Sequence, residues 1–388
     1  MAGASRSQVI LIPREQDAPA TLVVRAGLAS NAEILTVREL ALRSPFLDAD
    51  VTGEITDLLN TAHAKFEGTL TPDLEKISAF APQELKDKGF AMTGREARPA
   101  RFESDLADGI WGLRLRGKAE FNLFIESLAL LDVKASPEEA RLTLQNGNFA
   151  VTRYAPKIGT GQAELYPEIL LASDPFEIYI GGQRRPHLDA VPITSALADT
   201  LLVYVNPAFK GSVAEGLLTL RQDTTSIPLD DTWKDASFEC NVLLEQVQIK
   251  PGALLVEMLQ AIDLAPQTPV TLNRYESDIH CNDGKISTKP MTLMVKDMPV
   301  EFKGTTTLGG NVNFVATLTL TESIAGSAAW PHVKGAKLAV PITGTVAKPV
   351  MNAEKLREDF QALLKAAAAE RETELLKVIL DGLREENE

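Results

Sequence analysis

Long stretches of this chain alternate apolar and polar side chains with a period of two residues. Residues 111–125 do so, with arginine, lysine, glutamate and asparagine between the apolar positions, and residues 312–321 repeat the order. Successive side chains of a strand point to opposite faces, so this period predicts strands with one apolar and one wetted face. The first run predicts one very long strand, or two strands that meet near Gly117.

Turn-forming dipeptides separate several of the alternating runs. They are Asn146-Gly147, Asp283-Gly284 and Gly309-Gly310, and such pairs accept the positive φ angles of a tight hairpin. We expect residues 300–308 and 312–320 to pair antiparallel around the last dipeptide. The sequence thus predicts a mainly β fold, a long antiparallel meander that forms a curved sheet or groove.

Helical spacing appears in short stretches between the strands and once at the end of the chain. Residues 71–80, 195–205 and 251–262 are predicted to be short helices, the first opening at Thr71-Pro72-Asp73. Asn352 is expected to cap a long helix with an apolar stripe from Leu356 to Leu383. That helix either lies on the sheet or binds a partner or a membrane surface. We expect a β-rich half at 1–190, a second at 191–350 and the amphipathic helix at 351–388.

Composition excludes some classes of partner and of structure. Hydrophobic residues make up 45% of the 388 residues and charged residues 24%, as in ordinary globular proteins. The formal net charge of −14 repels phosphate backbones, so nucleic acid is not an expected partner. Cys240 and Cys281 are the two cysteines, which allow one disulfide or two free thiols.

Sequence motifs for catalysis or cofactor binding are missing. The four histidines, His63, His187, His280 and His332, lack the HExxH spacing of a metal site, and the chain has no G-x-S-x-G, P-loop or G-x-G-x-x-G motif. Adjacent acids such as Asp230-Asp231 are more typical of a solvated turn than of a glycosidase pair. We therefore expect no enzyme activity, no metal and no cofactor.

Targeting and membrane-spanning segments are not visible. The apolar run at residues 9–12 ends at Pro13, which is too short for a signal peptide, and no run of 18 apolar residues occurs.

Several segments resemble the AsmA-like family, which includes the AsmA and TamB-type envelope proteins. Residues 278–287 (DIHCNDGKIS), 300–305 (VEFKGT) and 310–314 (GNVNF) resemble its strand, "DG" turn, strand and glycine-marked hairpin. Residues 338–349 (LAVPITGTVAKP) look like its closing strand, which a helix follows, and residues 44–55 and 66–74 are similar to its repeating strand and short-helix units.

The resemblance implies a non-catalytic protein with an apolar β-groove that takes part in lipid transport or in outer-membrane assembly and maintenance. It implies a periplasmic or cell-envelope location, phospholipid or another amphiphile as ligand, and envelope membranes as partners through a missing amino-terminal anchor or partner proteins. The alternative is a structural scaffold that binds other envelope proteins through its sheet edge or its carboxy-terminal helix.

The two alternating runs supply candidate lipid-facing residues. Each gives a long apolar stripe, and the family resemblance implies a lipid-facing interior. The candidates are Leu113, Leu115, Phe121, Leu123, Val312, Phe314, Leu318 and Leu320.

Overall fold

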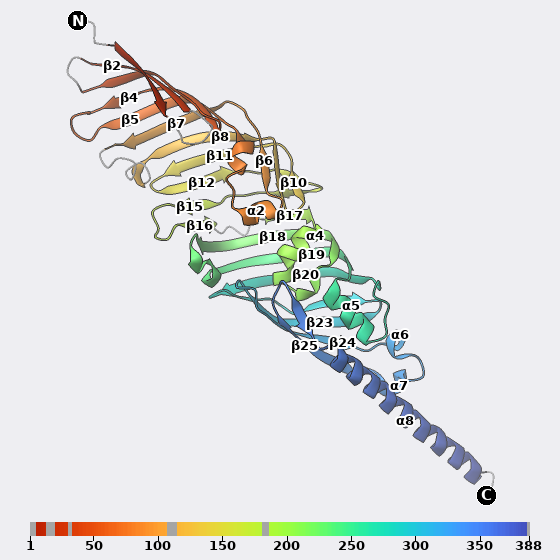
Figure 1. The fold of residues 1–388 in the computed structure, drawn as a ribbon. Coiled ribbons are helices and arrows are strands. Elements are labelled where there is room, and N and C mark those ends of the chain that lie inside the picture. Colours follow the sequence, from red (N-terminus) through yellow and green to blue (C-terminus); the bar gives the residue numbers. More distant parts are fainter. Residues whose placement is uncertain (1–4, 13–19, 30–32, 107–114, 181–185, 386–388) are drawn as a thin grey trace. The chain divides into compact units, whose positions relative to one another are not determined.

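The computed structural model describes residues 5–12, 20–29, 33–106, 115–180 and 186–385. It shows a mainly β protein, an antiparallel meander with short helices and a long carboxy-terminal helix, as the alternation predicts (Figure 1). The chain forms two compact units. Unit 1 comprises residues 1–192 and 219–238, and unit 2 comprises residues 193–218 and 239–388.

Unit 1 is built on a long ladder of antiparallel strands, the main ladder, whose strands lie side by side in Figure 1. In order of pairing they are β1 (Ser5–Ile12), β2 (Ala20–Leu28), β3 (Leu35–Arg43), β4 (Leu47–Thr56), β5 (His63–Pro72), β7 (Arg98–Asp105), β8 (Lys118–Ile125), β11 (Glu138–Gln145), β12 (Asn148–Arg153), β15 (Glu168–Leu170), β16 (Glu177–Ile180) and the end of β18 (Val213–Pro228).

A second, shorter ladder runs beside the first in unit 1. Its strands, in order of pairing, are β6 (Ala91–Thr93), β9 (Ser127–Leu130), β10 (Val133–Ala135), β13 (Lys157–Ile158), β14 (Gly161–Ala163) and β17 (Pro186–Pro192). The chain passes directly from one ladder to the other, since a single residue, Glu126, separates β8 from β9. Two short helices, α1 (Leu74–Ser78) and α2 (Gln83–Asp87), and the 3-10 helix η3 (Asp231–Asp235) complete the unit.

An apolar cluster joins the two ladders and α1. Its buried members are Leu74, Ile125, Ala140, Leu142 and Tyr154, and Met92 of β6 and Leu128 of β9 pack against it. Because α1, both ladders and the chain between them contribute side chains, this cluster is the core of the middle of unit 1.

Unit 2 is also an antiparallel meander, but its interior is closed. Its strands are the first part of β18, β19 (Ser237–Lys250), β20 (Val270–Asn282), β21 (Lys285–Ser287), β22 (Met291–Val295), β23 (Met298–Thr307), β24 (Val312–Thr319), β25 (Lys337–Gly344) and β26 (Pro349–Met351). Its helices are α4 (Ser195–Thr200), η1 (Leu202–Tyr204), η2 (Pro207–Phe209), α5 (Ala253–Ala261), α6 (Glu322–Ala325), α7 (Trp330–Val333) and α8 (Ala353–Glu385).

Helices and 3-10 turns cover the apolar side of the unit 2 strands. The Thr306 hydroxyl of β23 donates to the Tyr204 carbonyl at 2.6 Å, and the Asn206 amide donates to the Met291 sulfur of β22 at 3.2 Å. Phe209 of η2 and Met258 and Leu259 of α5 are fully buried. The interior of unit 2 is therefore a packed core.

The first half of the long helix α8 carries its buried side chains, and farther along Glu370 and Glu374 lie 3.4 and 3.9 Å from His332 of α7. Asn352 caps α8 as predicted, its side-chain oxygen accepting from the Lys355 amide at 2.9 Å. Leu356, Phe360 and Ala367 are buried, whereas residues 368–378 are all exposed.

Several local predictions are confirmed. Asn146-Gly147 and Asp283-Gly284 adopt positive φ angles in two-residue hairpins, and β23 pairs antiparallel with β24. Cys240 and Cys281, for which the sequence left a disulfide open, are not joined by one.

Two local predictions need correction. The first helix begins two residues later than expected, because Pro72 ends β5 and Asp73, not Thr71, is the N-cap of α1. The Asp73 carboxylate accepts from the Lys76 amide at 3.2 Å. The long strand expected over residues 111–125 begins only at Lys118, and Leu115 and Arg116 lie in a helical turn.

Candidate functional site

Two rows of apolar side chains cross the main ladder of unit 1, at right angles to its strands. Residues directly opposite each other in an antiparallel pair point to the same face, so the register defines both rows. The first is Val24, Leu40, Val51, Gly68, Ala100, Phe121, Leu142 and Val151, and the second is Gly53, Phe66, Phe102, Ala119, Leu144, Phe149, Ile169, Ile178 and Ile227. We call the face that carries them the apolar face.

The apolar face is long. The second row crosses strands β4 to β18, and its eight strand-to-strand steps of about 4.8 Å make it about 38 Å long. Every large side chain in the two rows except Leu142 is half-buried rather than buried. Unit 1 thus keeps an apolar stripe in partial contact with water along most of its main ladder.

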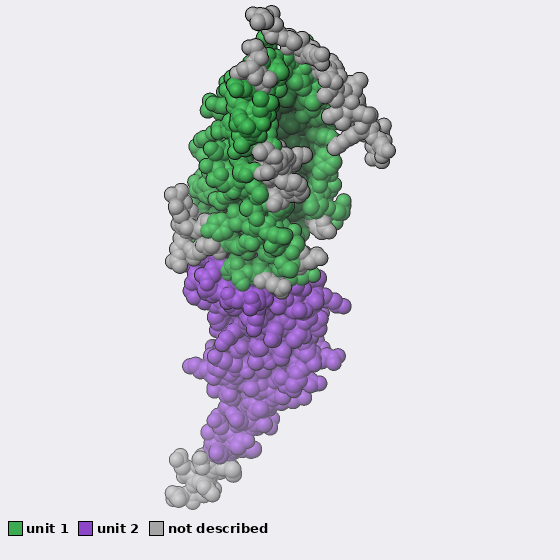
Figure 2. Space-filling view, turned by 90° about the vertical axis from the view of Figure 1, so that its left-hand side faces the viewer, with its two compact units in different colours: residues 1–192, 219–238 green, residues 193–218, 239–388 purple. Residues whose placement is uncertain are grey.

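A pocket opens on this face where the cluster around Leu74 does not cover it. Its volume is about 310 Å³, and it is lined by Leu40, Val51, Phe66, Leu70, Ala100, Arg101, Phe102, Ala119 and Phe121. Apart from Arg101 the lining consists of apolar residues. Figure 2 shows that the surface of unit 1 is hollowed on the side that it presents.

The opposite side of the same strands, the outer face, carries alternating charges. Lys65 lies opposite Glu103 and Glu67 opposite Arg101 across β5 and β7, and Arg101 and Glu103 lie opposite Glu120 and Lys118 across β7 and β8. Opposite charges in such pairs are favourable. The ladder is therefore strongly two-sided, with charge on one face and hydrocarbon on the other.

The candidates from the first alternating run have different environments. Leu113 lies outside the described residues. Leu115 is 43% exposed and precedes the strand, so the structure does not bring it into the rows. Phe121 lines the pocket and also packs against the cluster around Leu74, as does Leu123 two residues along β8.

The candidates from the second run lie in the interior of unit 2. Val312, Phe314 and Leu318 on β24 and Leu320 just after it are all buried, at 5% exposure or less. The packed core described above surrounds them. These four residues therefore take no part in the candidate site, which is confined to unit 1.

Sequence reasoning missed most of the residues that line the pocket. Leu40, Val51, Phe66 and Leu70 lie on β3, β4 and β5, where alternation is visible but short and interrupted by Gly53 and Gly68. Phe102 lies on β7, whose pairing with β5 spans the intervening residues 73–97. The available signal was the spacing of Phe66 and Gly68, which are two positions apart and therefore lie on the same face of β5.

Two of the polar residues named in the sequence analysis contact neighbouring polar groups. Asp230 caps η3 by accepting from the Thr232 amide and hydroxyl, which lowers the pKa of its carboxyl. His280 contacts the Glu239 carboxylate at 3.2 Å on the surface of unit 2. Within the described parts of the chain, no three histidine, cysteine or acidic side chains gather as a metal ion would require.

One polar atom stands out in the apolar cluster around Leu74. The Tyr154 hydroxyl is buried and has no hydrogen-bond partner among the described residues. Burial, with a smaller contribution from the nearby Glu138 carboxylate, raises the pKa of Tyr154 to about 12. A neutral hydroxyl is thus held in hydrocarbon surroundings.

Comparison with known proteins gives no match to a family model, a curated protein or a solved structure. None of the helices in the described ranges is both long and apolar enough to cross a bilayer.

Proposed function

We propose that this protein is a non-catalytic binding protein that holds a long-chain amphiphile, phospholipid first among the candidates, along the apolar face of unit 1. The observation that carries the proposal is the pair of half-buried apolar rows with their open pocket. The resemblance of several segments to AsmA-like proteins supports a role in lipid transport or outer-membrane maintenance at the cell envelope.

Folding leaves part of the apolar face in contact with water. Removing apolar surface from water stabilises a complex by about 25 cal/mol per Å², and contiguous apolar patches of this kind commonly mark binding sites. The rows are long and narrow and carry no charged member, which suits a flexible hydrocarbon chain better than a compact polar substrate. Its polar headgroup would remain in water at the rim.

The proposal is tested by looking for bound amphiphile. Native mass spectrometry and lipid extraction of gently purified full-length protein should reveal co-purifying phospholipid, and added fluorescent phospholipid should bind. Phe66→Glu should abolish binding, because it places a carboxylate on the apolar face. Val51→Trp should weaken binding by filling the pocket without adding charge.

Gln145→Glu is the matched control. Gln145 is exposed on the outer face directly opposite Lys118, so a carboxylate there meets a cation, and binding should be unchanged. Circular dichroism must show that each variant is folded. Folded wild-type protein that neither carries nor takes up lipid would refute the proposal.

A scaffold function is the second candidate, and the distal part of α8 favours it. Leu375, Leu376 and Val378 belong to residues 368–378 of the helix, all of which are exposed. An exposed apolar patch on a helix is a frequent docking surface for another protein. In this function the protein organises an envelope complex and carries no lipid.

A truncation separates the two functions. Removing residues 369–388 leaves the buried Leu356, Phe360 and Ala367 in place, so unit 2 should remain folded. Loss of partner capture with no bound lipid in the intact protein would support the scaffold. A partner that still binds the truncated chain would exclude the distal helix as its docking element.

A further inference from the structure

Residues 73–94 leave the main ladder and return to it without interrupting it. They separate β5 from β7 in the chain, yet β5 and β7 pair directly over eight positions, from His63 with Asp105 to Leu70 with Arg98. The segment, which holds α1, α2 and β6, is therefore an insertion beside the ladder, and we call it the lid segment. Figure 1 shows α2 and β6 on one side of the main strands.

One side chain of the lid segment closes the apolar face from above. Leu74 is 1% exposed and packs in the cluster with Leu142. Leu142 belongs to the first apolar row and is its only large member that is fully buried among the described residues. The lid segment thus covers the row next to the open pocket, which ends at Phe121, the cross-strand neighbour of Leu142.

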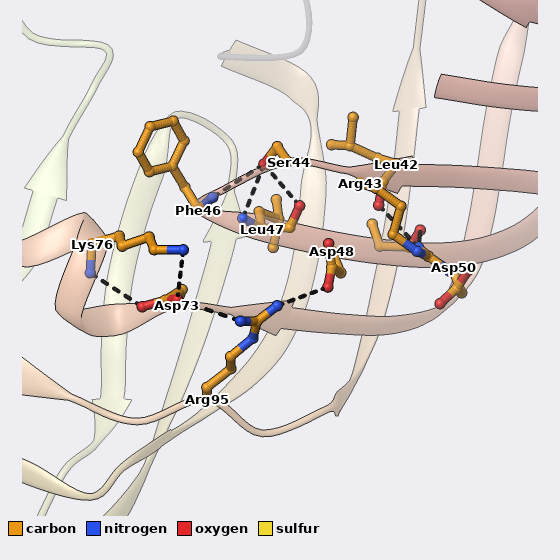
Figure 3. Close-up of polar contacts among 11 residues, drawn as sticks. Leu42, Arg43, Ser44, Phe46, Leu47, Asp48, Asp50, Asp73, Lys76 and Arg95 are labelled. Atoms are coloured by element: carbon orange, nitrogen blue, oxygen red, sulfur yellow. Dashed lines mark hydrogen bonds and ion pairs between the residues drawn. The ribbon is translucent and has the colours of Figure 1, made fainter. Parts of the chain in front are cut away.

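A small set of polar contacts at the surface fastens the lid segment, as Figure 3 shows. The Arg95 guanidinium lies 3.2 Å from the Asp48 carboxylate of β4 and 3.6 Å from the Asp73 carboxylate at the start of α1. The Asp73 amide donates to the Phe46 carbonyl at 2.8 Å, and the Leu74 amide donates to the Gly94 carbonyl at 3.0 Å. Arg95 therefore ties both ends of the lid segment to the β3–β4 hairpin.

Several apolar side chains of the lid segment are exposed to solvent. Phe80 is 66% exposed and touches Phe46 edge to face, with ring centroids 4.9 Å apart, and Ile77 and Leu85 are also exposed. Because they stay exposed, these side chains contribute little hydrophobic stabilisation to the observed position of the lid segment. The lid segment is thus held by Leu74 and Met92 in the cluster, by the short β6–β9 pairing with a few backbone hydrogen bonds, and by the ion pairs of the exposed Arg95. Ion pairs at the surface individually contribute little.

We propose that residues 73–94 form a lid that gates the apolar face, with Leu74 as its plug and Arg95 as its latch. Opening would withdraw Leu74 from Leu142 and extend the open part of the first row from the pocket towards Val151. The ligand assumed here is the amphiphile of the proposed function. The lid itself is a property of the protein without ligand.

Hydrogen exchange of the ligand-free, full-length protein tests the latch. In Arg95→Ala the amides of Leu74 and Glu126, which donate to Gly94 and Thr93, should exchange about two- to fivefold faster, as expected for the loss of exposed ion pairs. Arg95→Lys keeps a cation and should exchange at a rate closer to that of the wild type. Uptake of a fluorescent phospholipid should accelerate in Arg95→Ala in the same proportion.

Arg43→Ala is the control for charge removal on the same hairpin. Arg43 pairs with Asp50 at 2.6 Å and does not contact the lid segment (Figure 3). It should leave both rates unchanged. Exchange in Arg95→Ala equal to that of the wild type, or acceleration by Arg43→Ala as large as that by Arg95→Ala, would overturn the lid. Absence of lipid uptake in every variant would instead count against the proposed function, because the exchange rates report the latch without ligand.

Discussion

Phe66 on β5 and Phe102 on β7 lie directly opposite each other on the apolar face, while their neighbours Lys65 and Glu103 lie opposite each other on the outer face. One pair of strands thus presents a hydrocarbon surface to one side and two opposite charges to the other. Repeated along the main ladder, this arrangement makes unit 1 a two-sided sheet whose apolar side is partly open.

Gly68 is predicted to be required for the close pairing of β4 and β5. A Cβ at this position would lie 2.0 Å from the Asp50 carbonyl oxygen, which is backbone and cannot move aside. Gly68→Ala should therefore lower the free energy of unfolding by about 1–3 kcal/mol, measured by urea denaturation. Gly27→Ala is the control, since its Cβ would approach nothing closer than Arg38 at 3.8 Å. Equal stability of the two variants would contradict the argument.

Replacing Tyr154 by phenylalanine is expected to stabilise unit 1. The change removes a buried hydroxyl that lacks a partner among the described residues, and such a group costs about 1–3 kcal/mol. Tyr275→Phe should have the opposite effect, because the Tyr275 hydroxyl donates to the Lys289 carbonyl at 2.8 Å. Thermal unfolding of the two variants compares them. A destabilised Tyr154→Phe would show that this hydroxyl is satisfied in solution.

Tyr154 also predicts a loss of stability in alkali. Its pKa in the folded protein is about 12, against 10.0 for an ordinary tyrosine. Between these values the unfolded chain releases its proton first, so the folded state holds more protons and stability falls as pH rises. The loss is about 1.4 kcal/mol per unit of pKa difference. Between pH about 9 and pH about 12, the free energy of unfolding of the wild type should therefore fall more than that of Tyr154→Phe. Parallel plots of unfolding free energy against pH for the two proteins would contradict the raised pKa.

Substitution by glutamate should affect stability very differently at two neighbouring residues of β24. Phe314 is 3% exposed, so Phe314→Glu buries an unpaired carboxylate and should unfold unit 2, at a cost of several kcal/mol. Val315 is exposed and lies opposite Lys303, so Val315→Glu should change stability by less than about 1 kcal/mol. Circular dichroism during denaturation reports both, and a well-folded Phe314→Glu would contradict the closed core.

The two halves of α8 should differ in the same way. Leu356→Ala opens a cavity in unit 2 and should cost about 2–4 kcal/mol, whereas Leu376, which is 60% exposed, contributes little to folding. Leu376→Ala should leave the unfolding midpoint of the isolated protein unchanged. A large loss of stability in that variant would mean that the distal helix is covered in solution.

The fold class was predictable because it depends on local periods. Alternation identified β24 and most of β8, dipeptides with positive φ identified two hairpins, and the spacing of apolar residues with Asn352 as cap identified α8. The early part of residues 111–125 alternates equally well but does not extend β8, since helical residues 115 and 116 precede it. Alternation alone does not show where a strand begins.

The site was less predictable because it depends on what covers a face. Phe121 and Phe314 alternate with polar neighbours in the same way, yet Phe121 lines a pocket and Phe314 lies under the helices of unit 2. The coverage comes from segments distant in the chain, such as the turns around Asn206, and the pairing of β5 with β7 crosses an insertion. No local period reports either relationship.

The alternating charges of the outer face also specify how the strands align. A slip of two residues would leave the apolar face apolar, so hydrocarbon contacts discriminate weakly against it. Across β5 and β7, however, such a slip places Lys65 opposite Arg101 in one direction and Glu67 opposite Glu103 in the other. The same holds for β7 and β8, where Arg101 would meet Lys118 or Glu103 would meet Glu120. Like charges directly opposite each other are destabilising. Repulsion on the outer face therefore destabilises misaligned folding intermediates of this sheet.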